Sequence, residues 1–296
     1  MKLWSKGIFK IFALVAMLCV VGSVFAASTS LSEVSKKPVI IGKVDKRVKI
    51  LKDKIEIVDK LENGGKIILT TQKDFSKMDV VISDGLSLTR YKIYVLKSGN
   101  KYKVLLYEDN KLKQSLIMDK NPIKIITSNY IYSNIKYKSS WWLPSPETNI
   151  DLSLSGNPTG NVGDTDFLTV SVNSECQEPY FVVNAYYVKL PEGVEYIGGG
   201  GNPSDSVPAH GFGILHLDEG EYHDFAFHLG RVYGPCTVLV WYDARFLDSD
   251  YSDSKRVTIE YTSPGTKTIY GKSSITVIGL TYPWDVDSDS VCKVVR

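Results

Sequence analysis

The chain has 296 residues, of which 43% are hydrophobic and 23% charged, and its formal net charge at pH 7 is +2. This length is too great for one small module and is enough for two domains that each bury a core. The low net charge conceals two halves of opposite sign.

Residues 1–26 have the features of a secretory signal peptide. Lys2, Lys6 and Lys10 flank an apolar run that ends in small residues, with Val24-x-Ala26 as the cleavage motif. The alternative is an uncleaved membrane anchor, because the run is about the minimum length that spans a bilayer. We expect cleavage after residue 26 and a secreted chain at the cell surface, with no transmembrane segment after signal removal.

Residues 27–140 are expected to form a basic, β-rich domain. Runs such as KIILTT, RYKIYVL, KYKVLLYE, QSLIM and IKIIT alternate with turn residues, and strands at intervals of about 8 to 12 residues are typical of an antiparallel meander. The segment 47–61 also has apolar residues at helical spacing, but its β-branched content and the Asn-Gly that follows it favour a hairpin.

The charge of the chain changes sign near residue 140. Residues 27–140 hold 23 lysines and arginines against 12 acidic residues, whereas residues 141–296 hold 9 against 21. The basic half would attract an anionic partner such as a wall polymer, unless the two halves face each other. Nucleic acid is not expected as a partner, because an exported chain rarely meets it and because only Arg47 and Arg90 of the 23 basic residues in residues 27–140 are arginines.

The sequence SSWWLPSPETN marks the boundary between the halves, and residues 141–148 are expected to be a linker. Trp141 and Trp142 within it would either form an aromatic platform for a sugar or pack one ring into each domain. Both interpretations place aromatic side chains at the junction.

Residues 149–262 are expected to form an acidic β-sandwich. About eight strand-like runs, among them NIDLSLSG, DFLTVSV, YFVVNAYYVKL, CTVLVWYDA and KRVTIEYT, fall within this segment, as in a sandwich of short strands. Residues 263–296 follow as an extension with one or two strands. The run YGKSSITVIGL is too short to stand alone and must pair with the sandwich or with the basic domain.

The order NVGDTDFLTVSV, LPEGVEYIGGGG, ILHLDEGEYHDFAFHL and CTVLVWYDA resembles the Ig-like repeat and CARDB-type (cell-adhesion-related) domains of archaeal and bacterial envelope proteins. In that family a VGD turn opens the second strand, an LPxGVxY strand ends in a small-residue loop, and an LxxGExxxFxF hairpin follows. The resemblance covers residues 149–262 and implies an Ig-like sandwich. The cysteines and histidines depart from the pattern, so it implies no particular ligand.

All four histidines lie within residues 209–230. If this segment forms a hairpin, His216, Asp224 and His228 point outward, and Asp224 would contact His216 across the strands. These three residues are the best candidate for a transition-metal site. The alternative is that they are solvated side chains on a strand face.

Asp248, Asp250 and Asp253 resemble the opening of a calcium loop, although the glycine and glutamate positions of an EF-hand are not filled. A calcium site of another type in this loop competes with an ordinary acidic loop. No cofactor is expected, and calcium in this loop is the alternative.

Three cysteines remain after removal of the signal peptide: Cys176, Cys236 and Cys292. An exported protein can form disulfides, and one of the three must stay unpaired. Cys176 with Cys236 is the expected pair because both lie on strand-like segments of the acidic domain, although spacing alone does not decide which thiol stays free.

These features predict a secreted or envelope-associated structural or adhesive protein, similar to a surface-layer component. Its partners would be cell-envelope proteins or an anionic wall polymer, bound non-covalently. One alternative is a carbohydrate- or metal-binding extracellular module, and another is a secreted hydrolase with its site in residues 27–140. An enzyme is not the expectation, because no HExxH or G-x-S-x-G motif occurs.

Overall fold

The computed structural model of the chain describes residues 39–41, 46–83, 88–134, 146–176, 180–201, 211–247, 250–279 and 284–296. The fold is mainly β, as the sequence predicts. The expected signal peptide, His210, Asp248 and the pair Trp141 and Trp142 lie outside the described residues. Within the described ranges, no helix is long and apolar enough to cross a membrane.

The basic half forms an eight-stranded antiparallel sheet in which each strand pairs with the next along the chain. Its strands are β1 (Val39–Ile41), β2 (Lys46–Ile50), β3 (Lys54–Lys60), β4 (Lys66–Gln72), β5 (Lys77–Ser83), β6 (Leu88–Ser98), β7 (Lys101–Glu108) and β8 (Lys111–Met118). Asp109 and Asn110, both at positive φ, make the two-residue turn between β7 and β8. The predicted meander and the predicted hairpin at residues 47–61 are confirmed.

The run IKIIT is not a strand, as its β-branched composition led us to expect, but part of helix α2 (Pro122–Asn134). The Asn121 side chain accepts a hydrogen bond from the backbone N–H of Lys124 (3.2 Å), and Pro122 occupies the first turn, which are both features of a helix N-terminus. Ile123, Ile126 and Tyr130 lie at helical spacing and are buried. Burial of this face against the sheet outweighs the low helix propensity of isoleucine.

The acidic half is a β-sandwich of a six-stranded and a four-stranded sheet. The six-stranded sheet has the order β10 (Thr159–Gly160), β20 (Trp284–Val295), β19 (Gly265–Val277), β12 (Tyr180–Pro191), β17 (Cys236–Leu247), β14 (Gly211–Leu217). The four-stranded sheet has the order β13 (Val194–Gly199), β18 (Tyr251–Tyr261), β11 (Thr165–Glu175), β9 (Glu147–Leu154). A separate hairpin consists of β15 (Tyr222–Phe225) and β16 (Gly230–Tyr233).

The chain after residue 262 is an integral part of the sandwich and not an extension of it. β19 lies between β12 and β20 in the six-stranded sheet and pairs along its length with both. Of the two partners considered for this segment, it pairs with the sandwich. The sequence could not decide between them, because the pairing of β12 with β19 joins segments far apart in the chain.

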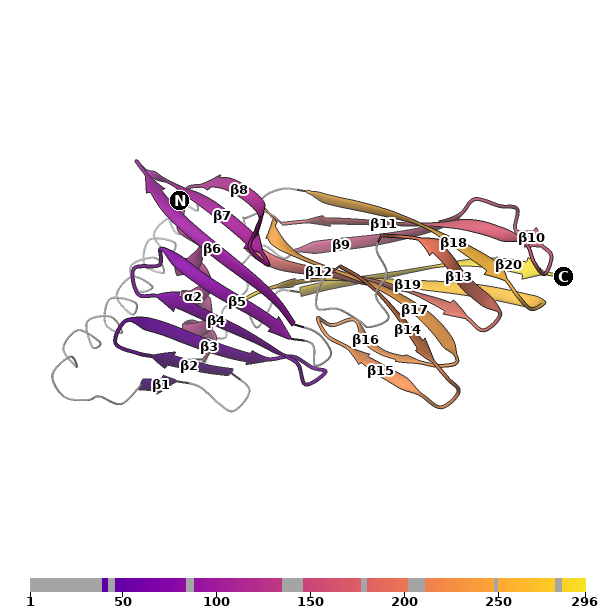
Figure 1. Cartoon of the computed structure of the whole chain (residues 1–296), viewed down its shortest axis with the longest axis horizontal. Helices are drawn as coiled ribbons and strands as arrows, with labels where there is room; N and C mark the ends of the chain where they lie inside the picture. Colours follow the sequence, from indigo (N-terminus) through magenta and orange to yellow (C-terminus); the bar gives the residue numbers. More distant parts are fainter. Residues whose placement is uncertain are drawn as a thin grey trace, which may run out of the picture.

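The central strands β12 and β17 of the six-stranded sheet are buried on both faces, and the two halves of the chain share a core. In β12, odd-numbered residues from Phe181 to Tyr187 belong to a cluster that includes Tyr91 and Ile93 of the meander. Even-numbered residues from Tyr186 to Leu190 belong to the core inside the sandwich. The molecule thus has three layers of sheet at the junction, with the meander at one end in Figure 1 and the sandwich extending from it.

Polar contacts cross the same junction. The Gln114 side chain donates to the backbone carbonyl of Phe246 (3.1 Å) and accepts from the backbone N–H of Phe246 (2.8 Å). The Lys113 ammonium lies 2.6 Å from the Asp243 carboxylate, and Lys113 also contacts Glu108. Part of the opposite charge of the two halves is therefore satisfied within the molecule.

Three aspartates of β20 connect the two sheets of the sandwich at the edge formed by β9. The carboxylates of Asp285, Asp287 and Asp289 accept hydrogen bonds from the backbone N–H groups of Thr148, Ile150 and Leu152 at 2.9, 2.9 and 2.7 Å. We call these three residues the aspartate ladder. Because these aspartates alternate along a strand, their side chains lie on one face and can accept from the N–H groups of the neighbouring edge.

Replacing Phe181 with alanine removes a fully buried ring from the shared core and should destabilise the protein by about 3 to 5 kcal/mol. Because the core is shared, urea unfolding followed by fluorescence and by far-ultraviolet circular dichroism should give one coincident transition in both proteins. Leu96→Ala, at a residue that is 54% exposed, should change stability by less than about 0.5 kcal/mol. Two separate transitions in the wild-type protein would contradict the shared core.

Asp287→Ala should cost about 1 to 3 kcal/mol, because it leaves the N–H of Ile150 without its acceptor. Asp151→Ala on β9 is the matched control, since Asp151 is exposed and lies on the outer face of the same strand. Chemical denaturation of the two variants measures the difference. Equal losses of stability would show that the aspartate ladder contributes nothing specific.

Candidate functional site

The face of the meander that points away from α2 and the shared core is basic. Strand alternation places the following residues on it: Arg47, Lys49, Lys54, Lys60, Lys66, Lys77, Arg90, Lys92, Lys101 and Lys103, with Glu56 and Asp79 as its carboxylates. We call this surface the basic face. Ten cations against two carboxylates give it a strongly positive potential.

Both carboxylates of the basic face are already paired. Glu56 lies 2.8 Å from the Lys49 ammonium, and Asp79 lies 3.1 Å from that of Lys77. Lys60 is directly opposite Lys66 across β3 and β4. Like charges directly opposite each other destabilise a sheet, so an anion placed between them would be favoured.

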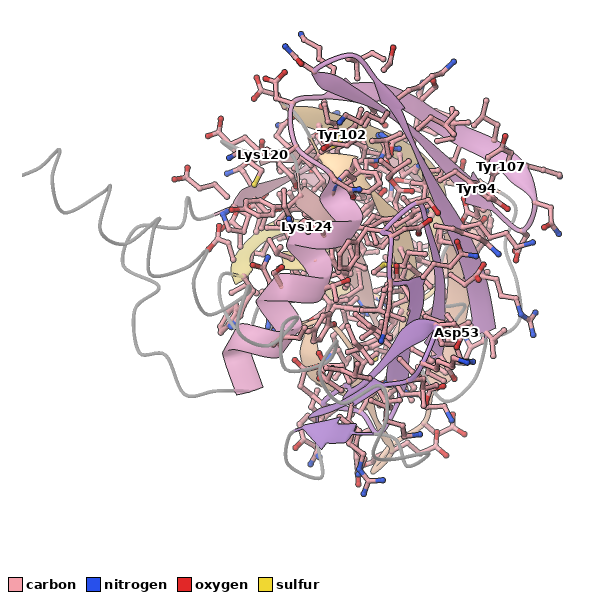
Figure 2. The ribbon with its side chains drawn as sticks, turned by 90° about the vertical axis from the view of Figure 1, so that its left-hand side faces the viewer. Asp53, Tyr94, Tyr102, Tyr107, Lys120 and Lys124 are labelled. Atoms are coloured by element: carbon pink, nitrogen blue, oxygen red, sulfur yellow. The ribbon has the colours of Figure 1, made fainter. Side chains whose placement is uncertain are left out.

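Aromatic and apolar side chains lie among these cations. The rings of Tyr94 and Tyr107 meet edge to face with centroids 5.7 Å apart, and both lie on the side of the sheet away from α2 (Figure 2). Leu96 and Ile117 flank Lys103 on neighbouring strands and are 54% and 61% exposed. The surface can therefore pair with anionic groups and also cover the apolar parts of a ligand.

The predicted metal trio is not assembled. Strand β14 pairs with β17 and not with β15, so the Nδ1 atom of His216 lies 3.0 Å from the Thr237 hydroxyl. Asp224 is bound through both carboxylate oxygens by Arg231, at 2.6 and 2.8 Å. Among the described residues, no three histidine, cysteine, aspartate or glutamate side chains are grouped to hold a metal.

His228 has a structural environment of its own. Its Nδ1 atom lies 2.7 Å from the Glu62 carboxylate of the meander, and its ring stacks on Trp284 at a centroid distance of 4.3 Å. Burial raises the pKa of Glu62, but the hydrogen bond from His228 and other contacts outweigh this effect and hold it below its usual value. His228 thus joins the β15–β16 hairpin to the meander and to the start of β20.

Of the aspartates in the predicted calcium loop, the structure describes Asp250 and Asp253. Asp253 accepts hydrogen bonds from the hydroxyls of Tyr186 (2.7 Å) and Tyr251 (3.1 Å) and lies 3.0 Å from the Lys255 ammonium. Asp250 is exposed. A carboxylate neutralised by lysine has little charge left for calcium, so the described part of the loop does not resemble a calcium site.

A cavity of about 760 Å³ opens where β11 ends beside the starts of β9, β18 and β20. It is lined by the aromatic rings of Tyr251 and Trp284, by amides and hydroxyls, and by carboxylates that include Glu147 and Glu175. One face of the Trp284 ring is covered by His228, and the side chain is 38% exposed. Sequence reasoning missed this tryptophan, because it assigned the aromatic ligand site to Trp141 and Trp142.

The expected disulfide between Cys176 and Cys236 does not form, and Cys292 is also a free thiol. Cys236 pairs with Pro191 at one end of β12, whereas Cys176 precedes Tyr180 at the other end. The 12 residues of β12 span roughly 40 Å, and a disulfide requires Cα atoms within about 7 Å. Cys176 directly follows strand β11 and Cys236 begins strand β17, but the two cysteines lie at opposite ends of β12.

A scan against models of protein families and a search of curated proteins find no match for the chain. Several solved structures resemble it weakly, among them the following two. AvmM, which catalyses macrocyclization in alchivemycin A biosynthesis, is 9% identical over 54% of this chain and 94% of its own, with a TM-score of 0.24. A pore-forming protein is 8% identical over 87% of this chain and 94% of its own, with a TM-score of 0.17. These values carry no argument, and the relation to CARDB-type domains stays a prediction.

Thiol labelling of the native protein should modify Cys292 and leave Cys176 and Cys236 unmodified, because only Cys292 is exposed. Burial also raises the pKa of Cys236, which lowers its thiolate fraction. After unfolding in denaturant without reductant, all three should react. Peptide mapping of the labelled sites measures this, and a Cys176–Cys236 disulfide found by mapping would contradict the structure.

The stability contributed by Asp253 should depend on pH. Burial raises its pKa, but the hydrogen bonds from Tyr186, Lys255 and Tyr251 lower it more, so the net pKa lies below 3.8. A carboxyl whose pKa is lower in the folded state adds stability above its unfolded pKa, and this stability is lost as the pH falls through the folded pKa. Asp253→Asn should therefore be less stable than wild type at about pH 7, and this deficit should shrink toward about pH 3.

Urea unfolding at both pH values checks this, with the exposed Asp151→Asn as the control. The control should show almost no deficit at either pH. A deficit for Asp253→Asn that is unchanged at the lower pH would contradict the assignment.

Proposed function

We propose that this protein is an exported structural or adhesive component of the cell envelope, which binds an anionic surface polymer non-covalently through the basic face. The observation that carries the proposal is the segregation of charge on the meander, where the outer face holds ten cations and two paired carboxylates. The leader-like first 26 residues support export.

The shape of the surface favours a polymer over a small anion. The cations are spread over strands β2 to β7 and not gathered into one pocket, so a chain with repeated negative groups would meet many of them at once. Lysine also outnumbers arginine on this face, and lysine acts as a point charge without the fixed geometry of bidentate recognition. Binding would therefore be strong at low salt, weakly selective and screened at high salt.

The alternatives from the sequence have different support. A hydrolase in residues 27–140 would need carboxylates available for acid and base chemistry, whereas Glu56, Asp79 and Glu108 each contact a lysine. The metal-binding alternative is not supported by its candidate residues, because His216, Asp224 and His228 do not lie together. One observation supports a carbohydrate-binding role, namely the cavity beside Trp284.

Lys92→Gln combined with Lys103→Gln should weaken binding to beads that carry dextran sulfate. Each lysine near an anionic surface contributes about 1 kcal/mol, so the double variant should bind roughly 30-fold more weakly at low salt. Lys120→Gln combined with Lys124→Gln is the matched control. It removes the same charge from the side of the meander where α2 lies (Figure 2) and should leave binding nearly unchanged.

The same pull-down with neutral dextran beads and with vesicles of anionic lipid separates polymer binding from other modes. Binding to dextran sulfate that high salt reverses supports the proposal. Equal weakening by both double variants would show a response to net charge alone and would overturn the basic face as the site. Binding to the vesicles without binding to the polymer would overturn the proposal in favour of a membrane surface.

The cavity beside Trp284 supports a second candidate function, the binding of a neutral or amino sugar. Aromatic rings stack on sugar faces, and carboxylates and amides accept hydrogen bonds from hydroxyl or ammonium groups. Trp284→Ala should abolish retention on an immobilised amino-sugar polymer such as chitosan at high salt, where the basic face is screened. Trp241→Phe, inside the sandwich, is the control and should keep it. Unchanged retention of Trp284→Ala would exclude the cavity as a sugar site.

A further inference from the structure

Lys293 and Asp166 form an ion pair that is almost completely buried inside the sandwich. Both side chains are 4% exposed, and the Nζ atom of Lys293 lies 2.6 Å from the Oδ2 atom of Asp166. Lys293 belongs to β20 of the six-stranded sheet, and Asp166 belongs to β11 of the four-stranded sheet. The pair therefore bridges the two layers of the sandwich.

A third group touches the same carboxylate oxygen. The hydroxyl of Tyr261 donates a hydrogen bond to Oδ2 of Asp166 at 3.0 Å, and the Lys293 ammonium lies 4.9 Å from the centre of the Tyr261 ring. Burial and the nearby carboxylate raise the pKa of Tyr261, so its hydroxyl stays protonated and can donate.

The segment between β9 and β11 covers the pair, and two of its glycines leave the space for it. A Cβ atom on Gly156 would lie 2.1 Å from Oδ1 of Asp166, and one on Gly160 would lie 2.5 Å from Cε of Lys293. Backbone hydrogen bonds hold this segment to the end of β20, from Val294 to Pro158 and from Arg296 to Gly160. The site is thus closed to water by backbone and not only by mobile side chains.

We propose that Lys293 and Asp166 condense to an amide, an intramolecular cross-link between β20 and β11. One proton passes from the ammonium of Lys293 to the carboxylate of Asp166, and the neutral amine then attacks Cγ. The new bond is Nζ–Cγ, and the bond that breaks joins Cγ to one carboxyl oxygen. That oxygen leaves as water with the transferred proton and a second proton from the amine, so no oxidant or other reactant is needed.

Two physical effects favour this reaction at a buried site. The pair is held in contact, and fixed reactants of this kind reach effective concentrations of about 10⁵ to 10⁸ M in favourable cases. In water an ammonium and a carboxylate resist condensation because both ions are hydrated. Burial removes that hydration, which brings the neutral amine and acid within reach. The Tyr261 hydroxyl then stabilises negative charge on the carbonyl oxygen during attack.

Peptide mapping of the purified full chain tests the proposal without any variant. Trypsin would normally release residues 139–189, which contain Asp166, separately from residues 273–293 and 294–296. The cross-link blocks cleavage after Lys293, so mass spectrometry should find residues 139–189 joined to residues 273–296, with the sum of their masses reduced by one water. Tandem fragmentation should place the bond between Asp166 and Lys293.

Three variants separate the cross-link from other losses of water. Lys293→Arg keeps the charge but lacks the amine and should lose the cross-linked peptide completely. Tyr261→Phe should form it roughly 100-fold more slowly, as expected for loss of one donor to a developing oxyanion. Lys267→Arg is the control, because Lys267 is also buried but donates to the Glu192 carbonyl and the Ser263 hydroxyl. It should keep the cross-link.

A cross-linked fraction that grows as the folded protein is incubated supports the proposal. The proposal is overturned if the protein still releases residues 294–296 in full after long incubation. Cooperative unfolding of the same sample shows that the protein was folded. Cross-linking that persists in Lys293→Arg also overturns the proposal, since another lysine would then be responsible.

Discussion

The burial of β12 and β17 on both faces is the constraint on which the rest of the structure depends. One face of these strands is covered by the meander and by the β15–β16 hairpin, and the other by the four-stranded sheet, so almost every side chain along them is buried. The halves of the chain cannot then be independent domains joined by a linker. The meander contributes to the core on the outer face of β12 and β17, and the apolar side chains that it covers there would be exposed without the meander.

This burial also decides where the charges of the chain lie. At the junction, Lys113 contacts both Asp243 and Glu108. Ten cations of the meander lie on its opposite face, because successive side chains of a strand point to opposite sides of the sheet. The basic face is thus a consequence of the same alternation that builds the core, and the acidic sandwich supplies too few contacts to neutralise it.

The local parts of the fold were readable from the sequence, and the non-local parts were not. Strand alternation and turn residues predicted the meander and most strands of the sandwich. The unbroken apolar runs of β12 and β17 were a signal of double burial that alternation does not give, and we read them only as strands. The metal trio does not form because β14 pairs with β17. The Cys176–Cys236 disulfide does not form because the two cysteines lie at opposite ends of β12. IKIIT is helical because its apolar face is buried. The ion pair of Lys293 and Asp166 joins residues 127 positions apart, which no local pattern reveals.

The aspartate ladder also determines how the protein can meet other β-strands. An unpaired strand edge offers N–H groups to any extended chain and is a common route to uncontrolled association. At β9 those groups are taken by carboxylates of the same molecule, and the carboxylates themselves repel an approaching backbone carbonyl. Copies of the protein packed densely on a surface would therefore not join through β9, and lateral contacts between them would have to form through side chains or at another edge of the fold.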